Sequence, residues 1–289
     1  MGHGTPAQKA HYLPHILSGE DYWRQGYSEP QADLAALALS AVSNGDDYVL
    51  TGTKLWTNHA HWANRMFCLV RTNADGKPQA GITFLLLDMT SPGITVQSIV
   101  TLAGEHEVNQ VFFDQVRVPK SGRIGAENVG WTVAKYLLEF ERGGSSGPGL
   151  KVALDTLTAM ARAEGLIADP AFRAKLARAG CALEAVEMTE HRVMAALAAG
   201  NNPGPASSML KTQGTKTLQM IDELALEAAG PYAAVDQIEA RAPGANLDWV
   251  GPEHSLTTTA RYLNDRAASI HGGSNEIQRD IMAKMVLGL

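Results

Sequence analysis

The run Ile270-His271-Gly272-Gly273-Ser274-Asn275-Glu276-Ile277-Gln278-Arg279 decides how the fold of this chain is interpreted. Its two adjacent glycines allow positive φ and a close approach of a ligand to bare main chain. The serine after them is a good N-cap, whose hydroxyl can accept the N–H of Glu276 or Ile277. The run therefore predicts a turn that opens a helix and offers N–H groups to an anion, a carbonyl oxygen or a phosphate. An ordinary capped loop is the alternative.

The composition is that of an ordinary globular protein. The chain has 289 residues, of which 45% are hydrophobic and 19% charged, enough for two domains of ordinary size. It has no apolar run of bilayer length and no signal-peptide pattern, so we expect a cytoplasmic protein without a membrane partner. A formal net charge of −6 without basic clusters argues against nucleic acid as a partner. Cys68 and Cys181 suit buried free thiols better than a disulfide or a metal site.

Short runs rich in β-branched and aromatic residues follow Asp21, with turn signals such as Asn44-Gly45 and Ser91-Pro92-Gly93 between them. These runs are Tyr48–Thr51, Met66–Val70, Ile82–Leu87, Ile94–Val96 and Val111–Phe113. Their spacing predicts an antiparallel β-sandwich or β-barrel.

After Gly130 the apolar residues recur at helical spacing. The segments with this spacing are Trp131–Phe140, Val152–Ala163, Phe172–Ala198, Ser207–Ala229 and Leu256–Ile270. They predict an all-α helical bundle, so the chain as a whole belongs to the α+β class. A separate short helix is expected over Gln8–Leu17, with Pro14 weakening its second half.

The run at 270–279 is preceded by three further distinctive stretches, at 25–34, 52–58 and 112–119. In this order the four stretches resemble the motifs of the acyl-CoA dehydrogenase family. The run at 270–279 resembles that family's C-terminal signature, aromatic-Glu-Gly-Thr-x-Gln-Ile-Gln-Arg, a turn that sits over the flavin. Gln25-Gly26-Tyr27-Ser28-Glu29-Pro30, followed by Asp33-Leu34, resembles the flavin-binding "SEP…D-L" loop. Gly52–Asn58 resembles the "G-x-K-x-W" strand, and Phe112–Pro119 resembles the "V-x-V-P" strand that closes the middle β-domain. The bacterial subgroup that includes pimeloyl-CoA dehydrogenase-like subunits is the nearest in pattern.

The resemblance implies a domain order. Residues 1–20 would be the remnant of an N-terminal helical domain, most of which is missing here. Residues 21–125 would be the middle β-domain, and residues 126–289 the C-terminal helical bundle. The family's chemistry then implies FAD as cofactor, an acyl-CoA substrate of fatty-acid metabolism, α,β-dehydrogenation with hydride transfer to FAD, and an acceptor of the electron-transfer flavoprotein type. A homo- or hetero-oligomer is expected.

At the position of the base that removes the α-proton, this chain departs from the usual pattern of the family. Many members have a Glu where this chain has Gly272, which cannot take a proton but keeps the N–H that serves as an oxyanion donor. A subset of the family places its Glu on an earlier helix in a Glu-Arg pair, which Glu141-Arg142 matches. Glu141 is then the expected base and Arg142 its orienting partner. The alternative is that Glu141 only ends its helix, where a glycine-rich run follows.

The resemblance also assigns cofactor contacts. Trp56 and Asn58 would lie beside the isoalloxazine ring, and Ser274 and Glu276 near the ribityl and adenosine portions. Three residues of the first loop, Gln25, Tyr27 and Ser28, fall where the family binds the flavin. Glu227 and Gly230 match a helix end that reaches the flavin of a neighbouring subunit. The usual Gly-Ser between "SEP" and "D-L" is shortened here to Gln31-Ala32.

Two further alternatives remain at this point. The chain can be a non-catalytic or half-site subunit that completes the flavin and substrate site of a partner dehydrogenase, because Gly272 replaces the usual Glu, the first loop is shortened and the N-terminal domain is absent. His59 and His61, two residues apart, would share one face of a strand and form a metal pair, although no other ligand cluster accompanies them. We therefore expect no metal.

Overall fold

The computed structural model describes residues 2–30, 33–141, 146–201 and 204–289, with the backbone alone for residues 139–141. The chain divides into two compact units. The first contains the residues up to Thr101 together with His106–Glu139, and the second contains Leu102–Glu105 and Phe140–Leu289. No helix in the described part of the chain is long and apolar enough to cross a membrane.

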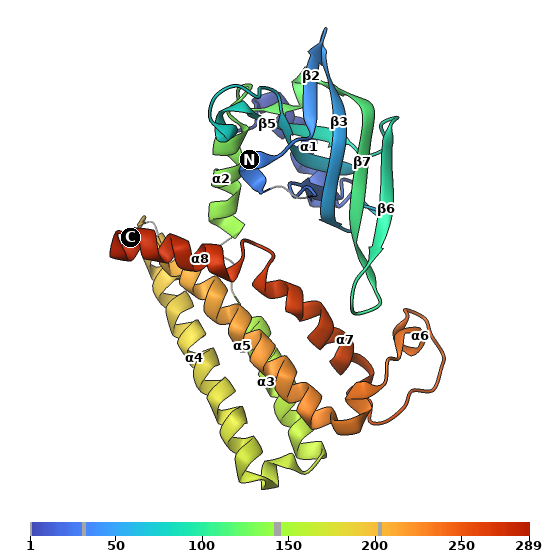
Figure 1. Ribbon diagram of the computed structural model, residues 1–289, viewed down its shortest axis with the longest axis vertical. Coiled ribbons are helices and arrows are strands. Elements are labelled where there is room, and N and C mark those ends of the chain that lie inside the picture. The colour runs from blue at the N-terminus through green and yellow to red at the C-terminus, as the bar shows by residue number, and fades with distance from the viewer. Residues whose placement is uncertain (1, 31–32, 142–145, 202–203) are drawn as a thin grey trace. The chain divides into compact units, whose positions relative to one another are not determined.

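The first unit is built on an eight-stranded sheet with the order β6-β7-β3-β2-β4-β5-β8, and β1 pairs with β4 off this path (Figure 1). The strands are β1 (Trp23–Gly26), β2 (Ser40–Asn44), β3 (Asp47–Asn58), β4 (Arg65–Arg71), β5 (Ile82–Asp88), β6 (Ile94–Val100), β7 (His106–Pro119) and β8 (Arg123–Ile124). Most pairs are antiparallel, as predicted, whereas β1 and β2 each pair with β4 in parallel. The sheet is therefore mixed. The chain between the two strands of each parallel pair forms a crossover connection, as parallel pairing requires.

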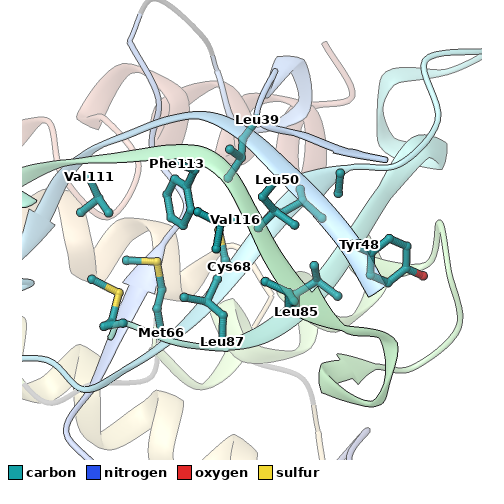
Figure 2. Packing of buried hydrophobic residues seen from close by; sticks show 14 of the residues in the cluster. Leu39, Tyr48, Leu50, Met66, Cys68, Leu85, Leu87, Val111, Phe113 and Val116 are labelled. Atoms are coloured by element: carbon teal, nitrogen blue, oxygen red, sulfur yellow. The ribbon is translucent and has the colours of Figure 1, made fainter. Parts of the chain in front are cut away.

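Strands β4 and β5 are buried on both faces. On one face Cys68, Leu85 and Phe113 belong to the cluster in Figure 2, whose side chains point toward one another between β3, β4, β5 and β7. On the other face Leu69 and Phe84 pack with Val133 of α2 (Gly130–Glu141). This double burial explains why both strands read as continuous apolar runs rather than as alternating ones.

The first helix, α1 (Pro6–Ser18), begins at a capping box formed by Thr5 and Gln8 and ends at Gly19, which has a φ of +80°. It continues through Pro14, so the proline does not end the helix at mid-length as the sequence suggested. The Gln8 amide fastens α1 to the sheet by donating to the carbonyls of Ser121 and Arg123, at 2.8 and 2.9 Å. Short 3₁₀ turns, η1 (Leu34–Ala36), η2 (Pro78–Gly81) and η3 (Lys120–Gly122), complete this unit.

The second unit is a helical bundle in which α3, α4 and α5 pack side by side (Figure 1). Its α-helices are α3 (Gly147–Ala163), α4 (Pro170–Ala198), α5 (Ala206–Ala229), α6 (Ile238–Arg241), α7 (Ser255–Asp265) and α8 (Asn275–Met282). Short 3₁₀ turns lie at η4 (Leu166–Ala168), η5 (Gly230–Ala234) and η6 (Arg266–Ser269), and a π-turn, η7 (Ala283–Leu287), follows α8. The predicted sequence of a β-domain followed by an all-α bundle is confirmed.

One local expectation needs correction. Cys68 is buried, but Cys181 is exposed, because it lies on the solvent face of α4. The segment between Val235 and Glu253 lies mostly at the surface and has local structure of its own. It contains α6, whose Arg241 is 7% exposed at its side chain and pairs with Glu105 at 2.5 Å.

Candidate functional site

The glycine turn, defined here as Gly272–Ser274, has the geometry that its sequence predicts. Gly272 has a φ of +68° and Gly273 a φ of +86°, both in the left-handed region that favours glycine. Ser274 is the N-cap of α8, and its Oγ accepts the N–H of Ile277 at 3.3 Å. No atom lies within 4 Å of the place where a Cβ would stand on Gly272. The turn therefore presents bare main chain to open space within its unit.

Gln278 holds the glycine turn from the inside. Its side chain is 1% exposed, and its Nε2 lies 3.5 Å from the carbonyl of Gly272 and 3.4 Å from that of Gly273. The C=O and N–H of a trans peptide point in opposite directions, so these contacts direct the N–H groups of Gly273 and Ser274 outward. Within the described residues no hydrogen bond reaches the N–H of any of the three turn residues. These donors are free for a ligand.

A lysine of α5 supports the start of α8. Lys211 Nζ donates to Oδ1 of Asn275 at 3.0 Å. Burial lowers the pKa of Lys211, and the charge of Glu276 acts in the opposite direction. The exposed carboxylate of Glu276 accepts its own backbone N–H, which is the main reason that the pKa of Glu276 is lowered. A carboxylate of this kind is favourable at a helix N-terminus.

The second cluster is the bulge edge, defined here as Gln25–Glu29 together with Lys54–Asn58 of β3. A buried ion pair joins its two segments. Lys54 Nζ lies 2.7 Å from Oε1 of Glu29, and the two side chains are 0% and 5% exposed. Glu29 also accepts the N–H groups of Ala38 and Leu39, and Lys54 donates to the carbonyl of Tyr27 at 3.1 Å. Every charge in this pair is therefore hydrogen-bonded, as burial requires.

A β-bulge re-aims Trp56 at this edge. Lys54 pairs with Val111 and Thr57 pairs with Asn109, which leaves Leu55 and Trp56 opposite a single residue of β7. Trp56 has a φ of +58°, a strained value for a bulky residue, and its side chain is 57% exposed. Bulges are common beside functional sites because they redirect a side chain. Here the bulge sends a large indole toward solvent rather than into the core.

The other predicted contacts at the bulge edge have different environments. Gln25 is half-buried in β1, Tyr27 is 7% exposed, and Ser28 is exposed while its carbonyl accepts the N–H of Leu55 at 2.8 Å. Asn58 is exposed and donates to Glu107 at 2.9 Å. Tyr27 is thus mainly a core residue that can offer a ligand little more than main chain. The shortened loop, Gln31-Ala32, lies outside the described residues.

The predicted base lies at the limit of what the structure describes. Glu141 is the last residue of α2, its side chain is outside the described residues, and so is the whole of Arg142. The chain resumes at Ser146, where Glu190 of α4 accepts the N–H groups of Ser146 and, at 2.9 Å, Gly147. Glu190 is 8% exposed. A buried carboxylate therefore anchors the start of α3, a few residues after Glu141.

Glu227 and Gly230 lie at the far end of α5 from the glycine turn. Glu227 pairs with Lys175 at 2.7 Å, and Gly230 ends α5 with a φ of +56°. Sixteen residues of helix separate Glu227 from Lys211, which contacts Asn275 beside the turn, a rise of about 24 Å. Within one chain these residues and the glycine turn therefore lie far apart.

His59 and His61 do not share a strand face. Strand β3 ends at Asn58, and both histidines lie in the following turn, where His59 has a φ of +49°. His61 Nδ1 lies 3.1 Å from Oδ1 of Asn109. Within the part of the chain that the structure describes, no group of three potential His, Cys, Asp or Glu ligands gathers.

Sequence reasoning missed the roles of Glu29, Lys54 and Gln278. The motif comparison quoted all three without giving them a function. One signal was available for Lys54, because it is a charged residue inside a strand and lies an even number of positions from the buried Tyr48 and Leu50, which places it on the same face. No local signal exists for Gln278, because its function depends on where the turn folds back.

Two sequence profiles match the chain. Residues 25–116 match the acyl-CoA dehydrogenase middle domain, and residues 128–287 match the acyl-CoA dehydrogenase C-terminal domain. The curated relative "Acyl-CoA dehydrogenase IpdE1" of Mycobacterium tuberculosis is 36% identical over 99% of this chain and 71% of its own length.

Solved structures agree in fold. "Tcur3481-Tcur3483 steroid ACAD" has a TM-score of 0.89 at 29% identity and covers 100% of this chain and 73% of that one. The ChsE4-ChsE5 complex from Mycobacterium tuberculosis has a TM-score of 0.83 at 29% identity and covers 100% of this chain and 74% of that one.

Proposed function

Because this chain belongs to the acyl-CoA dehydrogenase family of FAD-dependent oxidoreductases, we propose that it oxidises the Cα–Cβ bond of an acyl-CoA thioester. The observation that carries the proposal is the glycine turn, with outward N–H donors and open space above Gly272. A thioester oxygen that gains charge as the α-proton leaves needs such donors, since preorganised N–H groups stabilise developing negative charge.

Both clusters fit a flavin. The bulge edge offers an exposed indole at Trp56 as an apolar wall for a planar ring, and the exposed Ser28 and Asn58 provide polar groups beside it. The glycine turn offers main-chain donors and an N-capped helix start, which suit phosphate or carbonyl oxygens. We propose that Gln25, Tyr27, Ser28, Trp56, Asn58, Ser274 and Glu276 hold FAD in this way, with Glu227 and Gly230 reaching the flavin of a neighbouring subunit. When bound, FAD supplies the acceptor for the hydride that leaves Cβ.

Glu141 is the proposed base. Its carboxylate would take the α-proton while the N–H of Gly272 holds the thioester oxygen, and Arg142 would orient the carboxylate. An electron-transfer flavoprotein is the proposed acceptor that reoxidises the flavin.

The test is anaerobic reduction of the FAD-loaded protein. Acyl-CoA thioesters should bleach the flavin absorbance of the parent protein, and Glu141→Gln should abolish bleaching without releasing the flavin. Glu139→Gln, two residues earlier on the same helix, is the matched control and should behave like the parent. If Glu141→Gln bleaches at the parent rate, the base is another residue.

A second function has specific support. Gly272 stands where many relatives carry a catalytic Glu, and the structural relatives at 29% identity include a named two-component complex, ChsE4-ChsE5. The C-terminal end of the chain also exposes Met285, Val286, Leu287 and Leu289 at 62% to 81%, and exposed apolar residues that lie close together in a chain favour contact with a partner. In this alternative the chain is a half-site subunit of a heteromeric dehydrogenase.

The two functions separate experimentally. A half-site subunit, purified alone, should hold little flavin and give no thioester response, and it should gain both when co-expressed with a second dehydrogenase-like chain. A catalytic subunit should bind FAD and respond to thioesters as a homo-oligomer.

A further inference from the structure

Arg24, on β1 next to the bulge edge, is a half-buried arginine without an acid partner. Within the described residues no carboxylate forms an ion pair with its guanidinium. Its Nη2 lies 3.0 Å from Nδ1 of His59, and the guanidinium stacks on the ring of Tyr22 at 4.1 Å. Its Nε is fully buried and has no partner in the described part of the chain. Both close neighbours are therefore uncharged aromatic groups.

His59 does not compensate the charge. Arginine is always a donor, so Nδ1 of His59 accepts the hydrogen bond and this histidine is neutral. Burial and the charge of Arg24 both lower the pKa of His59, which keeps it so. The charge of Glu107 on β7 acts in the opposite direction on the pKa of His59 but is a smaller effect, and the Glu107 carboxylate accepts Nδ2 of Asn58 at 2.9 Å rather than a hydrogen bond from Arg24. Arg24 thus carries a positive charge that no ion pair compensates within the described residues.

A second arginine of the same sheet shows what ordinary compensation looks like. Arg65 on β4 pairs with Asp21 at 3.1 Å and with Asp88 at 2.6 Å. Burial lowers its pKa, but the hydrogen bond and charge of Asp21 and Asp88 outweigh burial, and the pKa of Arg65 is raised. For Arg24 burial is the cause, and its pKa is lowered. A desolvated charge without a partner costs stability, so its presence calls for a ligand.

The surroundings of Arg24 indicate the kind of ligand. His59 directly follows Asn58 of the bulge edge, and the ring of Trp62 lies 4.9 Å from that of His59. Trp62 is 65% exposed, so an exposed indole lies on the far side of the His59 ring that contacts Arg24. The combination suits a molecule with an apolar body and an anionic oxygen group at its end. A planar guanidinium binds carboxylate or phosphate in a bidentate manner.

We infer that Arg24 binds an anionic oxygen group of the thioester substrate and thereby selects among substrates. This inference rests on the proposed acyl-CoA substrate. The anion is either a terminal carboxylate on the acyl chain or a phosphate of the CoA moiety, because the guanidinium recognises both in the same way. Because Nε of Arg24 is buried, the ligand would use the Nη donors of the guanidinium, and its apolar body would lie on the indole of Trp62 beyond His59.

Equilibrium binding tests the inference without turnover. Calorimetry compares three ligands: a trans-2-enoyl-CoA, the same enoyl-CoA with a terminal carboxylate, and free CoA. Arg24→Gln should lower the affinity for a ligand that contacts Arg24 by about 10- to 100-fold, which is the value of a charge-assisted hydrogen bond. Arg24→Lys should lower this affinity less, because lysine keeps the positive charge. Arg117→Gln removes an exposed arginine that is paired with Asp47 and should change nothing.

The pattern over the three ligands identifies the anion. If only the carboxylated enoyl-CoA loses affinity, Arg24 binds the terminal carboxylate of the acyl chain. If all three ligands lose affinity equally, Arg24 binds a phosphate of CoA. If the parent binds thioesters and both Arg24 variants bind all three ligands as the parent does, the inference is wrong while the proposed function stands. If the parent protein binds none of the three ligands, the proposed substrate and this inference fail together. Thermal unfolding of each variant verifies that it is folded.

Discussion

The ammonium of Lys54 lies 2.7 Å from the carboxylate of Glu29, with both side chains withdrawn from solvent. The contact joins a loop before the sheet core to a strand twenty-five positions later in the chain. Because the same carboxylate also accepts two backbone N–H groups, the pair fixes how the bulge edge is assembled. Glu29 and Lys54 are therefore better understood as residues that hold the first loop against β3 than as residues that contact a ligand.

Breaking this pair should destabilise the fold. Lys54→Met leaves a buried carboxylate uncompensated, which costs about 3–5 kcal/mol of the free energy of unfolding. The double variant Lys54→Met with Glu29→Gln should recover part of the loss, because no charge then remains buried. Lys175→Met, which removes an exposed pair with Glu227, should cost less than about 1 kcal/mol. Urea unfolding measures all three, and equal losses for Lys54→Met and Lys175→Met would contradict the assignment.

Trp56 is expected to show a conflict between stability and function. Trp56→Gly relieves a φ of +58°, so the free energy of unfolding should stay level or rise by about 1 kcal/mol, although a large side chain is removed. The affinity for FAD should fall, since the exposed indole is lost. Trp62→Gly removes a similarly exposed indole from a turn residue without positive φ and should gain no stability. Flavin fluorescence titration and urea unfolding measure the two effects, and a clear loss of stability in Trp56→Gly would disprove the strain.

The two glycines of the turn should differ in their tolerance of alanine. In Gly272→Ala the new Cβ meets open space, so the cost is only that of a positive φ, about 1–2 kcal/mol. In Gly273→Ala the new Cβ would stand 2.5 Å from Nε2 of Gln278, so the turn must also shift. In both variants thioesters should reduce the flavin more slowly than in the parent, and the loss should be larger in Gly273→Ala. Gly244→Ala, also at positive φ in open space, is the control for strain alone.

Asp222 on α5 should make the protein less stable as pH rises. Burial, helped by the adjacent Asp265, raises the pKa of Asp222 from 3.8 to about 7, against the influence of Arg261. Between these two values the unfolded chain has released the proton and the folded protein still holds it. The free energy of unfolding therefore falls with rising pH, by at most about 1.4 kcal/mol per pH unit, and levels off above the folded pKa.

Asp222→Asn should remove this slope and should be more stable than the parent above neutral pH. Urea unfolding at several pH values between about 4 and 8 covers the window. Asp236→Asn, an exposed carboxyl beside Arg241, is the control and should keep the slope. Parallel curves for the parent and Asp222→Asn would show that another group is responsible.

The two cysteines should react differently. Cys68 is 0% exposed, and burial raises the pKa of its thiol to about 11, so little thiolate forms and reagents do not reach it. Cys181 is exposed. Iodoacetamide should therefore label only Cys181 in the folded protein and both cysteines after denaturation, as read by peptide mass spectrometry. Early labelling of Cys68 would mean that the sheet opens readily.

The order of the elements and the motifs could be read from the sequence. The apolar runs of β4 and β5, the helical spacing after Gly130 and the Gly272-Gly273-Ser274 turn are all local signals, and the structure reproduces each of them. These features depend on backbone preferences and on spacing along a few residues, which the sequence carries directly.

The contacts that give the candidate site its shape were decided only by the tertiary structure. The Glu29–Lys54 pair, the bulge at Trp56, the support of Gln278 for the glycine turn and the lone charge of Arg24 each depend on segments that meet after folding. Periodicity can tell which face of an element is buried. It cannot tell which distant group will lie there, because burial energy is non-directional whereas hydrogen bonds and ion pairs need a defined geometry.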